Sequence, residues 1–282
     1  MKSMFTRPLP SGRSSITRLF GAATLRERSL LFLALLPLLA AGQSYTPPRT
    51  PDGKPDLQGI WETRNAAAYD VSEVVEDHQI PYRPEALERE QKADRVDPIA
   101  HCAMPGVPRI TYIGFPFQII QRPGYVVFMY EYLHNQRVIS TNPRSHLEGI
   151  DFWLGDSVAR WEGGTLVIDV TNLGDKTWLD SARHMHSDEL HVVERYTRTG
   201  PNTITYEATL EDPKTYTRPW TIKMPLHRNT EPGFELREQE CTEGDDGRAI
   251  HPRYRPAPEG DPLEFVRSYP QEKRTDGKAG SK

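Results

Sequence analysis

The sequence predicts a mostly β fold, an antiparallel barrel or strongly curved meander that carries one short helix. About eight short segments are rich in β-branched and aromatic residues. Glycine and proline turn signals join most of these segments locally, as in up-and-down β architectures. The chain also contains 25 prolines, more than a bundle of long helices tolerates in its body.

The amino-terminal residues have the three parts of a secretory signal peptide. Residues 1–28 are rich in arginine, an apolar run follows from Leu30 to Ala41, and Gly42 ends it. We therefore expect residues 1–42 to be a signal peptide and the mature protein to be periplasmic or secreted. The alternative is an uncleaved membrane anchor, but the run is shorter than the roughly 20 residues that a span needs. No stable membrane span is expected after cleavage.

The rest of the chain divides by composition. Residues 43–56 form a proline-rich, polar arm that can be neither a helix nor a central strand. Residues 57–265 are expected to form a single β-barrel domain, although their number would also suit two small domains. Residues 266–282 are charged and almost free of apolar side chains, which predicts a disordered tail.

The secondary-structure elements can be placed in order along the domain. A helix is predicted from Pro84 to about Ala93, because proline is favoured in the first turn. Gly163-Gly164 is typical of a two-residue hairpin turn, whereas Pro123-Gly124 predicts a looser connection. The expected strands are 117–121, 125–133, 136–141, 158–162, 165–171, 190–197, 203–210, 220–224 and 234–239.

One predicted strand carries a stripe of large side chains. Alternation places five residues on one face, namely Val126, Phe128, Tyr130, Tyr132 and His134. Such an aromatic wall is typical of a ligand cavity and equally of an ordinary core edge, and the core is the commoner case. We expect Phe128, Tyr130 and Tyr132 to contact a ligand, together with Arg137 from the next strand and Trp178.

The two cysteines predict one structural disulfide. Cys102 and Cys241 lie in neither a CxxC pair nor a metal-ligand spacing. An even number of cysteines in an oxidising compartment usually forms bridges, so we expect Cys102 to pair with Cys241.

The segment Gly59-Ile60-Trp61 resembles the Gly-x-Trp signature of the lipocalins and the wider calycin group. The resemblance implies a calycin-like or lipocalin-like barrel, with Trp61 across the barrel floor and a tight turn at Gly59. Several stretches also resemble a family of exported, largely uncharacterised bacterial proteins. They are residues 49–57, 105–109, 157–163, 175–180, 184–196 and 212–214. This second resemblance implies export and a bacterial source, and names no reaction.

The densest group of chemically active side chains lies between Asp175 and Arg195. His184 and His186 resemble a metal-binding pair with His191 as a third ligand, but no short zinc motif such as HExxH is present. We therefore predict no metal and a site in which a carboxylate, Asp180, orients a histidine for proton transfer. The predicted catalytic residues are His134, His184, His186 and Asp180, with Arg137 holding developing charge.

Several function classes are disfavoured by what the sequence lacks. It has no Gly-x-Ser-x-Gly, which disfavours acyl-enzyme hydrolysis. It also has no glycine-rich phosphate loop and no dinucleotide fingerprint, which disfavours nucleotide and nicotinamide chemistry, and no cofactor is expected. A net charge of −4 without a basic stripe disfavours nucleic acid as a partner. The leading hypothesis is an exported barrel that binds a small organic molecule and performs acid–base chemistry of lyase, isomerase or cyclase type. The alternatives are a carrier of a small apolar ligand and an envelope interaction protein without a cavity.

Overall fold

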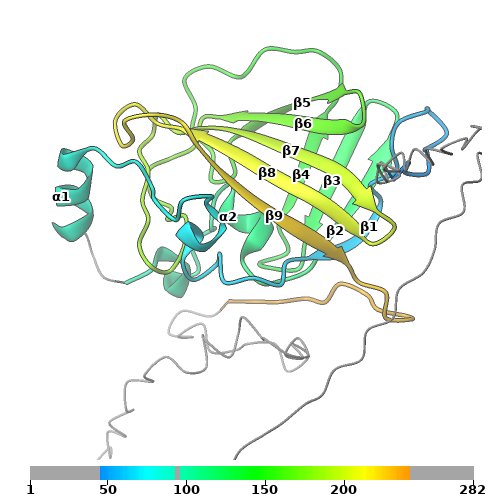
Figure 1. The fold of residues 1–282 in the computed structure, drawn as a ribbon, viewed down its shortest axis with the longest axis horizontal. Coiled ribbons are helices and arrows are strands. Elements are labelled where there is room, and N and C mark those ends of the chain that lie inside the picture. Colours follow the sequence, from blue (N-terminus) through cyan, green and yellow to red (C-terminus); the bar gives the residue numbers. More distant parts are fainter. Residues whose placement is uncertain (1–44, 93–95, 242–282) are drawn as a thin grey trace, which may run out of the picture. The chain divides into compact units, whose positions relative to one another are not determined.

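The structure is a computed structural model that describes residues 45–92 and 96–241, and it contains a closed barrel of nine strands (Figure 1). The predicted signal peptide and the predicted tail lie outside these residues. The strands are β1 (Gly59–Glu62), β2 (Phe117–Arg122), β3 (Tyr125–Tyr130), β4 (Gln136–Ser140), β5 (Asp156–Glu162), β6 (Thr165–Thr171), β7 (His191–Gly200), β8 (Thr203–Glu211) and β9 (Trp220–Arg228). The helices are α1 (Pro84–Lys92), α2 (Arg109–Tyr112) and the 3₁₀ helices η1 (Val71–Val74) and η2 (Pro98–His101). In this part of the chain, no helix is long and apolar enough to span a membrane.

The mostly β prediction is therefore confirmed, with strands joined almost entirely to their sequence neighbours. All adjacent pairs are antiparallel except β4 and β5, which run parallel and meet at Ser140 and Val158. β1 pairs with β2 on one side and with β9 on the other, which closes the barrel. The antiparallel order places residues 123–124, 163–164 and 201–202 at one end, which we call the floor end. Residues 131–135 and 172–190 lie at the opposite end, the loop end.

The barrel interior is built by alternation of buried and less buried residues, which is most regular in β8 and β9. In β8 every second residue is fully buried, namely Ile204, Tyr206, Ala208 and Leu210. β9 repeats the pattern with Trp220, Ile222, Met224 and Leu226. This period of two is the expected geometry of strands with one face inside a barrel. It gives one continuous core, and each strand presents a defined set of side chains to the lumen.

Trp61 closes the floor end as the Gly-x-Trp resemblance implied, and the barrel is calycin-like in this respect. Its side chain is fully buried, and its indole N–H donates to the backbone oxygen of Leu57 at 2.8 Å. The Arg228 guanidinium lies over the indole ring, 4.6 Å from its centroid, and donates to the Gln58 oxygen. Arg198 of β7 donates to the backbone oxygen of Asp56 at 2.7 Å. Arg198 and Arg228, which come from two strands, thus hold the segment before β1 across the end of the barrel through hydrogen bonds to its backbone.

Gly59 is required by this arrangement. Its φ is +131°, a conformation that residues with a side chain rarely adopt. A Cβ atom at this position would also collide with the Arg228 guanidinium. The glycine therefore lets the arginine approach the backbone and stack on Trp61.

Some predicted element boundaries are corrected by the structure. The strand predicted to reach residue 133 ends at Tyr130, and Leu133 and His134 both have a φ of +51° in the turn that follows. The segment 234–239 is not a strand of the barrel, and within it Gln239 makes only an isolated bridge to Tyr132. The predicted helix agrees with α1, and β7 and β9 are longer than expected.

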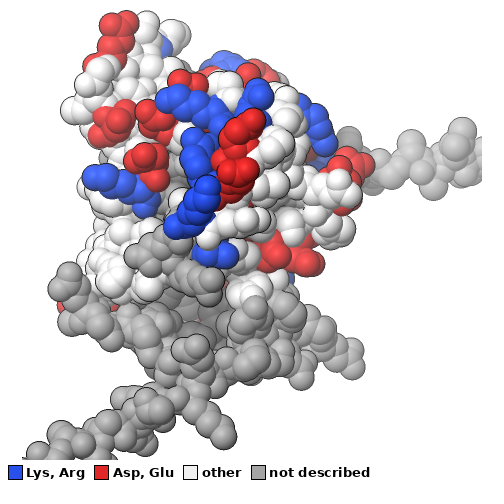
Figure 2. Space-filling view, turned by 90° about the vertical axis from the view of Figure 1, so that its left-hand side faces the viewer, with Lys and Arg blue, Asp and Glu red and all other residues white. Residues whose placement is uncertain are grey.

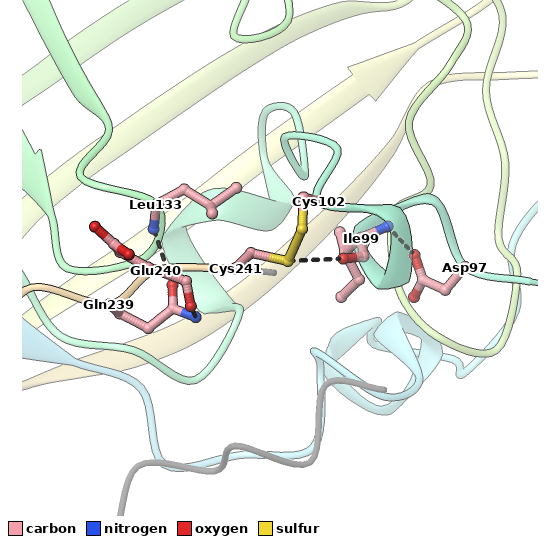
Figure 3. The surroundings of a disulfide bond; sticks show 7 residues. All are labelled: Asp97, Ile99, Cys102, Leu133, Gln239, Glu240 and Cys241. Carbon is pink, nitrogen blue, oxygen red and sulfur yellow. Dashed lines mark hydrogen bonds between the residues drawn. A yellow bond between two sulfur atoms is a disulfide. The ribbon is translucent and has the colours of Figure 1, made fainter. Parts of the chain in front are cut away.

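The predicted disulfide between Cys102 and Cys241 is present, with a Cα–Cα distance of 5.5 Å. It joins the residue after η2 to the segment that leaves β9 (Figure 3). The neighbouring Gln239 accepts a hydrogen bond from the Leu133 backbone N–H at 3.0 Å. The carboxyl-terminal part of the described chain is thus fixed against both the η2 region and the β3–β4 turn.

Charged side chains on the surface are mixed in sign. On the face shown in Figure 2, lysine and arginine side chains lie directly beside aspartate and glutamate side chains. Exposed ion pairs such as Lys214 with Asp188 and Lys223 with Glu207 follow the same pattern.

Candidate functional site

The lumen contains a buried ion pair between two strands, β4 and β7, that are not neighbours in the barrel wall. Arg137 of β4 and Glu194 of β7 both face inward, and their side chains are almost completely buried. Nη2 of Arg137 donates to Oε2 of Glu194 at 2.7 Å and to Oγ of Ser157 at 2.9 Å. Burying two charges in a core is costly unless they are paired and hydrogen-bonded. The pairing and the hydrogen bonds to Glu194 and Ser157 are what allow Arg137 to be buried here.

Two tyrosines also donate hydrogen bonds to Glu194. The hydroxyls of Tyr196 and Tyr206 donate to Oε1 of Glu194 at 3.0 and 2.9 Å. Burial, followed by the charge of Glu194, raises the pKa of both tyrosines well above the usual value. Both therefore remain neutral donors. Thr111 of α2 contacts the Tyr196 hydroxyl at 3.3 Å, so the short helix reaches the same network.

Two side chains of this network keep polar groups without a partner. Nε and Nη1 of Arg137 and the hydroxyl of Tyr130 are buried and have no hydrogen-bond partner among the described residues. Buried donors in folded proteins are almost always satisfied by protein, ordered water or a ligand. The Arg137 and Tyr130 donors therefore mark a place in the lumen where an acceptor is expected.

Aromatic rings surround these donors. The rings of Phe128 and Tyr196 lie 5.2 Å apart, those of Phe117 and Tyr130 lie 5.5 Å apart, and the Arg137 guanidinium lies 5.8 Å from the Phe128 centroid. Phe128, Tyr130 and Arg137 were all predicted as ligand contacts, and the structure brings them together.

The other two predicted ligand contacts lie beyond the strands. Tyr132 is buried in the turn after β3 and packs on Phe115, with ring centroids 5.3 Å apart. Trp178 is buried in the 172–190 loop, where it bridges to Met185. Both lie at the loop end rather than on the strand positions that line the lumen.

The predicted partnership of Asp180 with a histidine is formed with His184. Nδ1 of His184 lies 2.5 Å from Oδ2 of Asp180, and the backbone N–H of His184 donates to Oδ1. Asp180 is fully buried and also accepts from the Val71 N–H at 2.6 Å. A carboxylate held in this way fixes the Nδ1–H tautomer and leaves Nε2 available for proton transfer.

Further acidic groups surround this Asp180–His184 pair. Burial by itself lowers the pKa of His184, but the hydrogen bond and charge of Asp180, with Asp70 and Glu90, outweigh it and raise the pKa. Tyr82 stacks on the imidazole with centroids 6.2 Å apart. Ligand atoms of Asp70, Asp180 and His184 also lie close enough together to hold a metal ion. This group differs from the metal-ligand set considered from the sequence, which consisted of His184, His186 and His191.

The remaining predicted catalytic histidines have other partners. His186 is buried, and its ring nitrogens contact the Thr177 hydroxyl at 2.7 Å and the Ser187 backbone oxygen at 2.9 Å. Burial lowers its pKa, and both nitrogens are occupied, as in a structural histidine. His134 is half-exposed in the β3–β4 turn, and its Nε2 lies 3.8 Å from Glu238. It shares the loop end with His184, but its described contacts do not include His184 or Arg137.

A further histidine cluster, which the sequence did not indicate, lies on the outer surface of β5–β7. The two ring nitrogens of His146 contact Asp156 at 2.9 Å and Asp169 at 3.0 Å. His191 contacts the same Asp169 oxygen at 2.9 Å. Arg144 forms a two-bond ion pair with Asp156. These contacts fasten the β4–β5 connection to the barrel wall.

Glu194, Tyr196 and Tyr206 were missed as site residues although their strands were predicted. The available signal was the position of Glu194 along β7, two residues from Val192 and from Tyr196 and therefore on the same inward, buried face. A carboxylate in phase with an apolar face predicts a buried partner.

Comparisons with known proteins add no family to this description. No protein-family model matches the chain, and no curated protein shows significant similarity to it.

Proposed function

We propose that this protein binds a small organic molecule inside its barrel, against Arg137 and Tyr130. The observation that carries the proposal is the set of buried donors on these two side chains that lack partners in the described residues. The aromatic rings around them supply the apolar contact area that small-molecule sites use. A carrier of purely apolar ligands is supported less, since its lumen would contain no ion pair.

We also propose that the protein acts in the periplasm or outside the cell. The Cys102–Cys241 disulfide supports this location, because structural disulfides are rare in the cytosol. The resemblance of several stretches to an exported bacterial family points the same way.

The test of ligand binding uses a fluorescent aromatic probe, 1-aminoanthracene, titrated into the protein. We expect saturable binding that Phe128→Trp weakens at least about tenfold, because the added bulk fills the lumen. Met129→Trp is the matched control, because Met129 is the next residue and faces solvent. If Phe128→Trp unfolds, Ala159→Leu adds bulk at another inward position. Absence of binding, or equal binding by the inward variants, would support an interaction protein with a filled core instead.

A second candidate function is acid–base catalysis at His184. The observation that favours it is the 2.5 Å contact between His184 and the fully buried Asp180. This contact orients one ring nitrogen as a proton acceptor or donor, the arrangement needed for lyase or isomerase chemistry. No cofactor is required for such a step.

The catalytic candidate can be tested with 5-nitrobenzisoxazole, which opens when a base removes its ring proton. We expect His184→Gln to lower the rate by about 10²-fold and Asp180→Asn to lower it in the same direction. His78→Gln is the control, because His78 is exposed and lies outside the Asp180–His184 pair. An unchanged rate in His184→Gln would remove this residue from the list of catalytic candidates.

A further inference from the structure

The charge balance inside the lumen bears on the kind of molecule that binds there. Arg137 is the positive group and Glu194 the negative group, joined at 2.7 Å in a site from which water is largely excluded. Glu194 is fully engaged, because it accepts from Arg137, Tyr196 and Tyr206. The pair is therefore neutral as a unit, and its positive charge is already compensated.

The unpartnered groups can all donate, and the Tyr130 hydroxyl can also accept. Nη2 of Arg137 is used by Glu194 and Ser157, which leaves the N–H groups of Nε and Nη1. Burial raises the pKa of Tyr130, and the charge of Arg137 opposes this only in part, so the hydroxyl keeps its proton. A bound molecule must therefore offer an acceptor atom.

An anionic acceptor would add a second negative charge close to Glu194. Like charges in a low-dielectric interior repel strongly, and desolvating an unpaired anion is costly. A carbonyl oxygen accepts the same hydrogen bonds without adding charge. The rings of Phe128 and Tyr130, whose planes lie 16° apart, suit a flat unsaturated body next to that oxygen.

We propose that the lumen selects an uncharged aromatic or conjugated molecule that presents a carbonyl oxygen to Arg137 and Tyr130, in preference to a carboxylate or phosphate. This inference rests on the proposed binding function and names the chemical class of its ligand. The selectivity comes from Glu194, which compensates the arginine and so removes its attraction for anions.

Three probes that share one skeleton test the inference. They are 6-acetyl-2-(dimethylamino)naphthalene, 6-(dimethylamino)-2-naphthoate and 2-(dimethylamino)naphthalene, and each is titrated by its own fluorescence at about pH 7. We expect the ketone to bind at least about tenfold tighter than the carboxylate, and also tighter than the parent amine, because one or two hydrogen bonds to buried donors are gained.

Three variants test the separate contributions of the polar group, the aromatic body and the charge of Glu194. Tyr130→Phe removes one donor and should weaken the ketone by about five- to tenfold while leaving the parent amine unchanged. Met129→Ala, on the outer face of the same strand, should change neither probe. Glu194→Gln leaves Arg137 uncompensated, so the preference should shift toward the carboxylate. If Glu194→Gln does not fold, the Tyr130→Phe comparison alone decides.

Each outcome has a defined meaning. Tighter binding of the carboxylate by the wild type, or equal binding of all three probes, overturns the ligand class. If 1-aminoanthracene still binds in a way that depends on Phe128, the binding function survives that result. If neither 1-aminoanthracene nor any naphthalene probe binds, the binding function itself fails, and the ligand class fails with it.

Discussion

Replacing Trp61 by alanine tests the floor of the barrel directly. Trp61 is fully buried between the segment before β1 and the Arg228 guanidinium. Its removal eliminates the largest side chain at this end, one hydrogen bond to Leu57 and the ring on which the arginine stacks. The floor is also where β1 pairs with β9, so the loss is expected to affect barrel closure.

The expected cost follows from these contacts. A buried tryptophan truncated to alanine typically lowers the free energy of unfolding by about 3–5 kcal/mol. Arg228→Met keeps much of the aliphatic stem but loses the cation–π contact and the bond to Gln58, which should cost about 1–3 kcal/mol. Because the two side chains touch, the double variant should lose less than the sum of the two single variants.

Urea unfolding followed by far-ultraviolet circular dichroism measures these differences. The chain has five tryptophans, so fluorescence would change with the substitution itself and is less suitable. Trp153→Ala is the control, because Trp153 is 43% exposed and its loss should change stability by about 0.5 kcal/mol or less. A Trp61→Ala variant as stable as this control would refute the role of Trp61, and strict additivity with Arg228→Met would refute the stacking contact.

Three further predictions follow from contacts described above. Gly59→Ala should lower the free energy of unfolding by about 1–3 kcal/mol, because φ is +131° and the new Cβ meets Arg228. Gly174→Ala, with nothing within 4 Å, is the control and should change it little; equal effects in urea melts would contradict the strain argument. The Cys102→Ser/Cys241→Ser double variant should lose up to about 5 kcal/mol by the chain-entropy model for a separation of 139 residues. Thiol titration of the unfolded, unreduced wild type should find no free thiol, and two free thiols would disprove the bridge. Because the folded-state pKa of His184 is raised, its contribution to stability is complete below the unfolded pKa of about 6.5 and is lost as pH rises through the folded pKa. The stability difference between wild type and His184→Asn should therefore be larger at about pH 5.5 than at about pH 8.5, and the opposite trend in urea melts would contradict the assigned shift.

The strands could be predicted because alternation is a local signal. β8 and β9 bury every second residue, and a two-residue turn fixes the register between Glu162 and Thr165. The segment 234–239 was wrongly assigned as a strand because strand propensity does not report whether a partner edge is available. In this barrel β1 and β9 pair with each other, so no free edge is left for a tenth strand.

Contacts between site residues could be predicted from the sequence where the two residues are close in the chain, and could not where they are far apart. Asp180 and His184 are four residues apart in one loop, and their pairing could be predicted from this spacing. Arg137 and Glu194 are 57 residues apart, and their contact depends on how strands that are not consecutive close around the lumen. His134 was placed on the aromatic face because the strand was extended by a few residues. The chain instead turns at Leu133, where φ is positive, and the alternation ends.

The pairing of β1 with β9 has a consequence for how the protein can form. Trp61 pairs with Arg228, so the first and last strands of the barrel must meet before the wall is continuous. Contacts between residues so far apart in the chain make folding slow, because a long loop must close before the contact stabilises it. During synthesis, β1 has no partner on its β9 side until residue 228 has left the ribosome. The barrel is therefore completed only after translation of this region, and partly folded chains expose two strand edges until that moment.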